Sequence, residues 1–109
     1  MTKAEIMKAF LKKDLSTLDN LKAHVGETLK PCGSFFSQSD GSERSRDQIV
    51  IDFTNGKTYR TGCAAFMKRW DDFMKTFGAE LEPAEWPEIK IISKRSKSGN
   101  EFIDFEVII

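Results

Sequence analysis

The final part of the chain shows the clearest alternation of hydrophobic and polar residues. Ile89-Lys90-Ile91 and the run from Ile103 to Val107 place apolar and charged side chains in turn, a period of two that is typical of strands with one buried face. Residues 96–100, between the two runs, contain Gly and Asn, which tolerate the positive φ of a tight turn. The pattern predicts a closing β-hairpin whose tip carries three cations, Lys94, Arg95 and Lys97.

The middle of the chain predicts a second hairpin. Residues 48–54 alternate in the same way, and the Asn55-Gly56 pair that follows is a strong signal for a two-residue turn. The return strand is expected at residues 57–61. Before this hairpin we expect a polar loop at residues 37–47. A strand is also expected at residues 27–36, irregular or at a sheet edge because it contains proline and glycine.

Aromatic residues recur at helical spacing after the second hairpin. The stripe consists of Phe66, Trp70, Phe73 and Phe77. This spacing predicts an amphipathic helix whose rings face the core and which ends at Gly78 in a left-handed cap.

Capping signals near the start of the chain predict two further helices. One is expected at residues 2–13, where Thr2 and Glu5 form a capping-box pattern, and one from residue 16 to about residue 24. We therefore treat residues 1–26 as an N-terminal helical extension.

The predicted elements after this extension follow the order β-β-β-α-β-β. This is the order of a five-stranded OB-fold barrel, so we predict a mainly β, α+β domain of that kind over residues 27–109, within a single domain of residues 1–109. An open α+β sandwich with the same order is the alternative. In OB-folds, the loops joining strands one to two and four to five flank the oligonucleotide-binding face. Here both of these loops carry cations: Arg44 and Arg46 in one, and Lys94, Arg95 and Lys97 in the other.

Composition and charge narrow the class of protein. Hydrophobic residues make up 39% and aromatic residues 11%, which favours a packed globule. Lys+Arg and Asp+Glu both number 17, so the clustering of charge matters more than its total. Residues 79–88 hold four Glu and no cation, while residues 94–97 hold three cations and no acid. No apolar run has the roughly 20 residues of a membrane span, and the N-terminus lacks the pattern of a signal peptide.

Few residues suit catalysis. The chain has one histidine, His24, and its two cysteines lack any C-x-x-C spacing. Phosphate-loop, dinucleotide-binding and zinc-hydrolase motifs are missing from the sequence. We expect no enzyme activity, no metal and no cofactor, and we expect Cys32 and Cys63 to be reduced, partly buried thiols of a cytoplasmic protein.

Binding of single-stranded nucleic acid requires cations that follow the backbone and exposed aromatic faces on which bases stack. Phe102 is expected to point away from the core, and of the consecutive Phe35 and Phe36 one must do so. The candidate contacts are the cations Lys57, Arg60, Lys90, Lys94, Arg95, Lys97, Arg44 and Arg46 and the rings of Phe102, Tyr59 and Phe35.

Residues 57–109 resemble small bacteriophage single-stranded-DNA-binding proteins with an OB-fold. The similarity lies in the aromatic helix followed by K-x-S-K-S-G-N-E-F and a final acidic-apolar strand, and the likeness extends over roughly residues 27–109. The resemblance implies binding of single-stranded DNA during phage or mobile-element replication or recombination. It also implies no cofactor, frequent oligomerisation, and host or phage replication proteins as partners.

The alternative function is binding to another protein, such as a host replication or defence factor. Separate acidic and basic patches suit electrostatically guided association. The candidate contact is the acidic segment Glu80–Glu88, in which Trp86 resembles a binding hot spot inside a polar rim.

Overall fold

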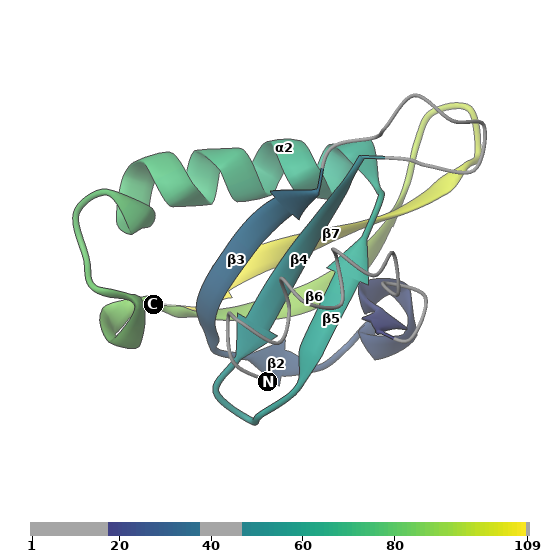
Figure 1. Cartoon of the computed structure of the whole chain (residues 1–109). Coiled ribbons are helices and arrows are strands. Elements are labelled where there is room, and N and C mark those ends of the chain that lie inside the picture. Colours follow the sequence, from purple (N-terminus) through teal and green to yellow (C-terminus); the bar gives the residue numbers. More distant parts are fainter. Residues whose placement is uncertain (1–17, 38–46, 109) are drawn as a thin grey trace.

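The structure is a computed structural model that describes residues 18–37 and 47–108. Its strands form two sheets, and helix α2 runs across one end of both (Figure 1). The strands are β1 (Asp19–Asn20), β2 (Thr28–Leu29), β3 (Pro31–Ser37), β4 (Gln48–Phe53), β5 (Thr58–Thr61), β6 (Glu88–Arg95) and β7 (Glu101–Ile108). The helical segments are η2 (Leu21–His24), α2 (Ala64–Phe73), η3 (Met74–Gly78) and η4 (Pro83–Glu85). Within these residues, no helix is long and apolar enough to cross a membrane.

The two sheets have the strand orders β1-β5-β4-β3 and β2-β6-β7. When β2 and β3 are taken together as the first predicted strand, the predicted order β-β-β-α-β-β is confirmed. The described part of the chain is therefore mixed α+β. However, β5 and β7 do not pair with each other, so the sheets do not close on themselves. The prediction of a five-stranded barrel is wrong.

The outer edge of β5, which a closed barrel would need, is occupied by β1. Asp19 pairs with Tyr59 and Asn20 with Arg60 in a parallel arrangement. The Arg60 side chain adds a hydrogen bond from Nε to the Leu18 carbonyl (3.1 Å). This edge of β5 is thus partly occupied by β1, at Tyr59 and Arg60.

The predicted N-terminal helical extension is wrong where the structure describes it. Only residues 21–24 are helical, in a single short turn that begins at Asn20, whose side chain accepts a hydrogen bond from the Lys22 amide (3.0 Å). The two residues before this turn form β1 instead. The predicted helix at residues 2–13 lies outside the described residues.

The predicted strand at residues 27–36 is divided between the two sheets. β2 pairs with β6 and β3 pairs with β4, so the chain passes from one sheet to the other at Lys30. The register shifts between Pro31 and Gly33, and β3 is the last strand of its sheet. The register shift and the edge position confirm the predicted irregular edge strand. Proline is tolerated at an edge because it has no N–H group to donate to a neighbouring strand.

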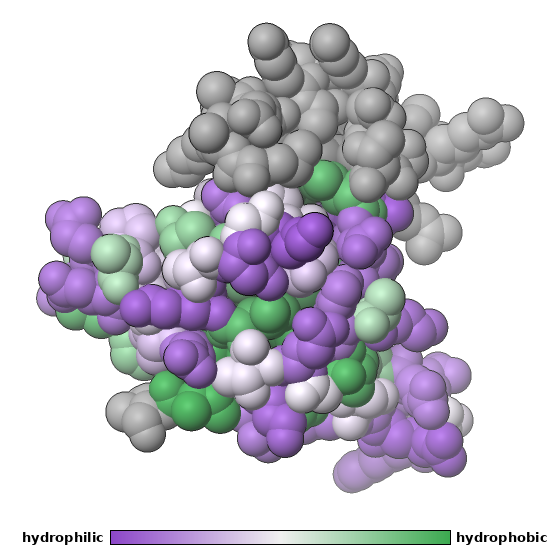
Figure 2. Space-filling view, turned by 90° about the horizontal axis from the view of Figure 1, so that it is seen from below, coloured by the Kyte–Doolittle hydropathy of each residue, from purple (hydrophilic) through white to green (hydrophobic). Residues whose placement is uncertain are grey.

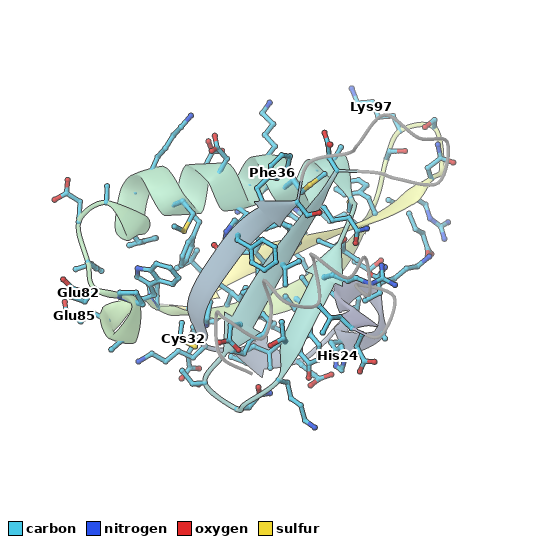
Figure 3. All side chains as sticks on the ribbon, in the orientation of Figure 1. His24, Cys32, Phe36, Glu82, Glu85 and Lys97 are labelled. Carbon is cyan, nitrogen blue, oxygen red and sulfur yellow. The ribbon has the colours of Figure 1, made fainter. Side chains whose placement is uncertain are left out.

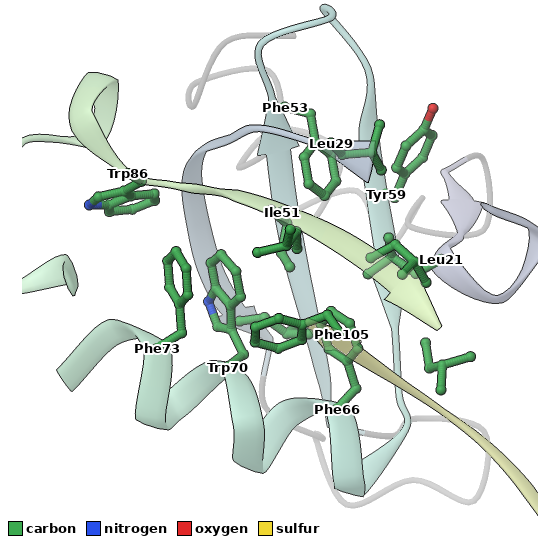
Figure 4. Close-up of a cluster of buried hydrophobic side chains, with 14 residues drawn as sticks. Leu21, Leu29, Ile51, Phe53, Tyr59, Phe66, Trp70, Phe73, Trp86 and Phe105 are labelled. Atoms are coloured by element: carbon green, nitrogen blue, oxygen red, sulfur yellow. The ribbon is translucent and has the colours of Figure 1, made fainter. Parts of the chain in front are cut away.

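The aromatic stripe on α2 fills the space between the sheets, as predicted. Phe66, Trp70 and Phe73 are all buried, and their rings surround that of Phe105 from β7 at centroid distances of 5.0, 5.9 and 6.0 Å (Figure 4). The Trp70 indole nitrogen also donates to the Ser34 hydroxyl (3.1 Å), which links the helix to β3. Burial of these rings holds α2 against both sheets.

The end of the helix differs from the prediction. Gly78 does not adopt a positive φ; the chain continues from α2 into the wider turn of η3 before it ends. A Cβ atom at Gly78 would lie 2.7 Å from Cε of Met74. Gly78 thus lets the flexible end of the Met74 side chain lie close to the backbone, and it does not form a left-handed cap.

The closing hairpin is confirmed in its strand pairing, but not in the alternation of β7, where Asp104 is buried as well as Ile103 and Phe105. β6 and β7 pair from Glu88 with Ile108 to Arg95 with Glu101, and Gly99 in the turn has φ of 88°. Ile103 and Phe105 are buried, as predicted. The hairpin extends beyond the region that α2 covers, so its tip stands clear of the core (Figure 1).

We predict that Phe105→Ala lowers the free energy of unfolding by about 3–5 kcal/mol, because it leaves a cavity among the three α2 rings. Phe36→Ala is the matched control: Phe36 is 56% exposed, so its truncation should change stability by no more than about 0.5 kcal/mol. Urea unfolding of the two variants checks this. Equal losses would show that the α2–β7 cluster does not dominate the core.

Candidate functional site

An open groove of about 640 Å³ lies between the end of β5, η2 and the β6–β7 hairpin. It occupies the place where β5 and β7 fail to pair. Its lining residues are Asn20, Lys22, Val25, Gln48, Arg60, Thr61, Gly62, Cys63, Ser93, Glu101, Phe102 and Ile103. We call it the β5–β7 groove.

Side chains from the start of α2 cover the edge of β7 beside this groove. The Cys63 thiol donates to the Ile103 carbonyl (3.6 Å), and Arg69 Nη2 donates to the Phe105 carbonyl (3.3 Å). The Phe105 amide donates to Asp104 Oδ1 (2.8 Å). These backbone groups of β7 are therefore satisfied without a neighbouring strand, which keeps the groove open.

Phe102 and Lys94 face each other across the hairpin. They are directly paired in the β6–β7 register, and cross-strand partners point to the same side of a sheet. Phe102 is half-buried and Lys94 is exposed. Among the described residues, no aromatic ring packs against Phe102, in contrast to the rings of the core. Phe102 thus lines the groove, and the Lys94 side chain extends from the same side of the hairpin.

Asp104 is a buried carboxylate on the same face, two residues after Phe102. Its Oδ2 lies 2.9 Å from Lys94 Nζ, and its Oδ1 accepts from Arg69 Nε (3.2 Å). Burial alone would raise the pKa of the Asp104 carboxyl. However, the hydrogen bonds from Lys94 and the Phe105 amide, and the positive charges of Lys94 and Arg69, lower that pKa below its ordinary value. Asp104 therefore remains ionised and joins the hairpin to α2.

The remaining cations of the hairpin differ in how they are held. Arg95 pairs with Glu101 across the strands (Nη2 to Oε1, 3.2 Å). Lys97 lies in the turn and is exposed at the tip (Figure 3). No ion-pair partner for Lys97 is found in residues 18–37 and 47–108.

Two cations come from the other wall of the groove. Arg60 is half-buried and donates to the Leu18 carbonyl and to Gln48 Oε1 (3.4 Å), so its position is fixed. Lys22 on η2 is exposed. The sequence predicted Arg60 as a contact but did not single out Lys22.

The structure does not bring the other predicted cations to this groove. Lys57 follows the β4–β5 turn, which lies at the opposite end of the molecule from the β6–β7 turn (Figure 1). Lys90 is paired with Glu106 and Thr28 in the middle of the three-stranded sheet. Arg44 and Arg46 lie outside the described residues.

Two of the predicted aromatic contacts are corrected. Tyr59 is only 5% exposed and stacks on His24, with ring centroids 3.9 Å apart, so it offers no free face. Phe35 is half-buried and packs with Leu18 and Val50. Phe36, not Phe35, is the exposed member of the pair, because its alternate position points away from that small cluster. Of the three predicted rings, Phe102 alone lies at the β5–β7 groove.

The histidine lies between two carboxylates. His24 Nδ1 is 2.5 Å from Glu27 Oε2, and Nε2 is 3.4 Å from Asp19 Oδ2 without the geometry of a hydrogen bond. Within the described ranges, no group of three or more His, Cys, Asp and Glu side chains is arranged to hold a metal ion. His24 instead holds η2 against β5, because its ring stacks on that of Tyr59.

A second groove of about 550 Å³ lies between β3 and α2. Phe36, Met67 and Met74 line it together with Lys68 and Asp71. The charged residues in the lining of this second groove are Lys68 and Asp71, both on α2. Their charges balance, so this groove lacks the excess of positive charge found beside Phe102.

The acidic segment does not present the surface that the protein-binding alternative requires. Trp86 is 5% exposed, packs edge-on against Trp70 and Phe73, and donates from its indole nitrogen to the Leu81 carbonyl (3.3 Å). Glu82 and Glu85 are exposed at the opposite end of the molecule from Lys97 (Figure 3). In the view of Figure 2, the surface is mainly hydrophilic with separate hydrophobic residues between.

Both cysteines are free, half-buried thiols. Burial and the nearby charge of Asp52 raise the pKa of the Cys32 thiol, so it remains protonated at neutral pH. The expected partial burial of both thiols is confirmed, and they are not paired with each other.

Sequence reasoning missed Asp104, Arg69 and Lys22 as site residues. Asp104 was read as a solvent-facing charge of an alternating strand, and nothing in the local pattern distinguishes it from Glu106. For Arg69 a signal existed: it lies three residues after Phe66 and four before Phe73, which places it at the border of the buried stripe on α2.

No model of a known protein family, no curated protein and no solved structure matches this chain. A function for it therefore rests on its own residues and their geometry.

We predict that Asp104→Asn lowers the free energy of unfolding by about 2 kcal/mol at neutral pH, because hydrogen bonds to charged groups contribute roughly 1.5–3 kcal/mol. A carboxyl whose pKa is lowered by folding stabilises the protein above its unfolded-state pKa, near about 3.9, and this contribution is lost as the pH falls through the folded-state value. The difference between wild type and variant should therefore shrink as the pH is lowered below about 4 in urea unfolding experiments.

Asp71→Asn is the control for this prediction. Asp71 on α2 forms an exposed pair with Lys75 on η3 (2.9 Å), which should contribute no more than about 0.5 kcal/mol. A difference between wild type and Asp104→Asn that stays constant down to acidic pH would contradict a role for the Asp104 charge.

Proposed function

We propose that this protein binds single-stranded DNA without sequence specificity, as a binding protein and not as an enzyme. The observation that supports this best is the pairing of Phe102 with Lys94 beside the β5–β7 groove. A half-buried ring without a ring partner in the described ranges offers a face for a base, and the adjacent ammonium group suits the phosphate. Stacking tolerates any base, because every base has a π-face.

The charges around Phe102 fit a strand that passes from the groove to the hairpin tip. Lys22 and Arg60 line the groove at one end of this path, and Lys97 lies at the other. Arg95 contributes less, because Glu101 offsets its charge. Affinity is therefore moderate and depends on a few unpaired cations and on stacking, which supplies roughly 1–3 kcal/mol per base.

The biological setting follows from the resemblance of residues 57–109 to phage proteins of this function. We propose that the protein acts in phage or mobile-element replication or recombination, in the cytoplasm of a bacterial host. Self-association and contact with replication proteins belong to the same proposal. The protein-binding alternative loses its main support, because the Trp86 ring is buried in the core.

Labelled oligo-dT should bind in a fluorescence-anisotropy titration, and binding should weaken as salt rises from about 50 to 200 mM. Each phosphate contact adds about 0.7 to the slope of log affinity against log salt for a single strand. Duplex DNA should compete poorly, because the bases of a duplex cannot stack on Phe102. Absence of binding at the lower salt, or equal competition by duplex, would refute the proposal.

Phe102→Ala should weaken oligo-dT binding about tenfold, because one base–ring stack is worth roughly 1–3 kcal/mol. Phe36→Ala is the matched control, since it removes an exposed ring of the same kind at the other groove. The same titration compares the two variants at one salt concentration. A larger loss for Phe36→Ala would place the strand on the groove between β3 and α2.

A further inference from the structure

Arg69 and Lys94 come from different elements but bind the same carboxylate. Arg69 Nε lies 3.2 Å from Asp104 Oδ1, and Lys94 Nζ lies 2.9 Å from Asp104 Oδ2. Asp104 is nearly inaccessible, with a side chain that is 7% exposed, whereas the side chains of Arg69 and Lys94 are each 51% exposed. The two cationic heads are thus brought together at the surface by an anion that lies beneath them.

Both cations keep unused hydrogen-bond donors. Arg69 donates from Nε to Asp104 and from Nη2 to the Phe105 carbonyl (3.3 Å), and its guanidinium packs over the Phe105 ring at 5.6 Å. Nη1 makes no bond within the described residues. Lys94 uses one donor of its ammonium group on Asp104. Since a guanidinium and an ammonium group carry more donors than these contacts use, both remain able to bind an anion.

The charges at this point do not cancel. Two cations face one carboxylate whose pKa is lowered, so the cluster keeps a net positive charge at neutral pH. The cations are also held in place before any ligand arrives, because Asp104 is fixed by the Phe105 amide (2.8 Å). Such fixed donors lose little conformational entropy on binding an anion.

We infer that Arg69 and Lys94 together form a phosphate-binding site for the DNA backbone, arranged by Asp104 next to Phe102. This inference rests on the proposed function and adds to it a residue of α2 that the hairpin alone does not supply. A base stacks on Phe102 while its phosphate binds the two cations at Asp104, two residues after Phe102 on the same face. Asp104 is a positioning residue, and it does not touch the DNA.

Arg69→Gln tests this inference in the oligo-dT titration at several salt concentrations. We expect weaker binding and a salt slope that is smaller by about 0.7, the value for one lost phosphate contact on a single strand. Arg69→Lys keeps the charge and should retain most of the slope. A purely structural role of Arg69 would alter stability without changing the slope, so the urea midpoint of each variant is measured alongside.

Lys75→Gln is the matched control, because Lys75 lies on η3, which continues α2, and is likewise paired with an aspartate, Asp71 (2.9 Å). It should leave affinity and slope unchanged. If Arg69→Gln does not fold, the double variant Arg69→Gln, Asp104→Asn replaces the ion pair by two amides, and the same loss of slope is expected.

The outcomes separate the inference from the proposed function. If wild type fails to bind oligo-dT, the proposed function itself is wrong. If wild type binds and Phe102→Ala weakens it, while Arg69→Gln behaves like Lys75→Gln, the function stands and the phosphate site at Arg69 is refuted.

Discussion

The packing of α2 against β7 is the contact on which the other features of this structure depend. Phe66, Trp70 and Phe73 bury their rings around Phe105, and this places the beginning of the helix along the outer edge of β7. Cys63 and Arg69 then satisfy two β7 carbonyls that a further strand would otherwise bind. Burial of the aromatic rings thus fixes the polar contacts of α2 with β7. With its aromatic face held in the core, the helix places the side chains beside that face against the edge of β7.

The open groove is a consequence of that arrangement. With one edge of β5 occupied by β1 and the edge of β7 covered by α2 side chains, neither strand has a row of free backbone groups with which to pair. A gap therefore remains between the sheets, and Phe102 and Lys94 lie beside it on a hairpin that extends past the core. An exposed edge strand invites unwanted pairing with other chains, and the contacts from Cys63 and Arg69 block this at Ile103 and Phe105.

The buried carboxylate of Asp104 connects the scaffold to the proposed binding surface. A buried charge is costly unless it is well paired, and Asp104 is paired with Arg69, Lys94 and a backbone amide. The stability of the hairpin and the location of two surface cations consequently depend on the same group. This explains how a chain with no net charge can concentrate positive charge at one place.

The sequence by itself determined the elements that depend on local periodicity. The period-two runs appear as β4 and as the hairpin of β6 and β7, and the aromatic stripe from Phe66 to Phe73 lies on α2 as predicted. Each pattern reports a single strand or helix with one buried face. Only the tertiary structure decided which edges pair, that Asp19–Asn20 joins β5, and that the strand at residues 27–36 serves two sheets. It also decided that Tyr59 is buried, that Phe36 is exposed and that Asp104 lies beneath Lys94 and Arg69. Each of these features depends on contacts between residues far apart in the chain, such as those of Arg69 and Lys94 with Asp104. The spacing of residues along a single strand or helix does not predict such contacts.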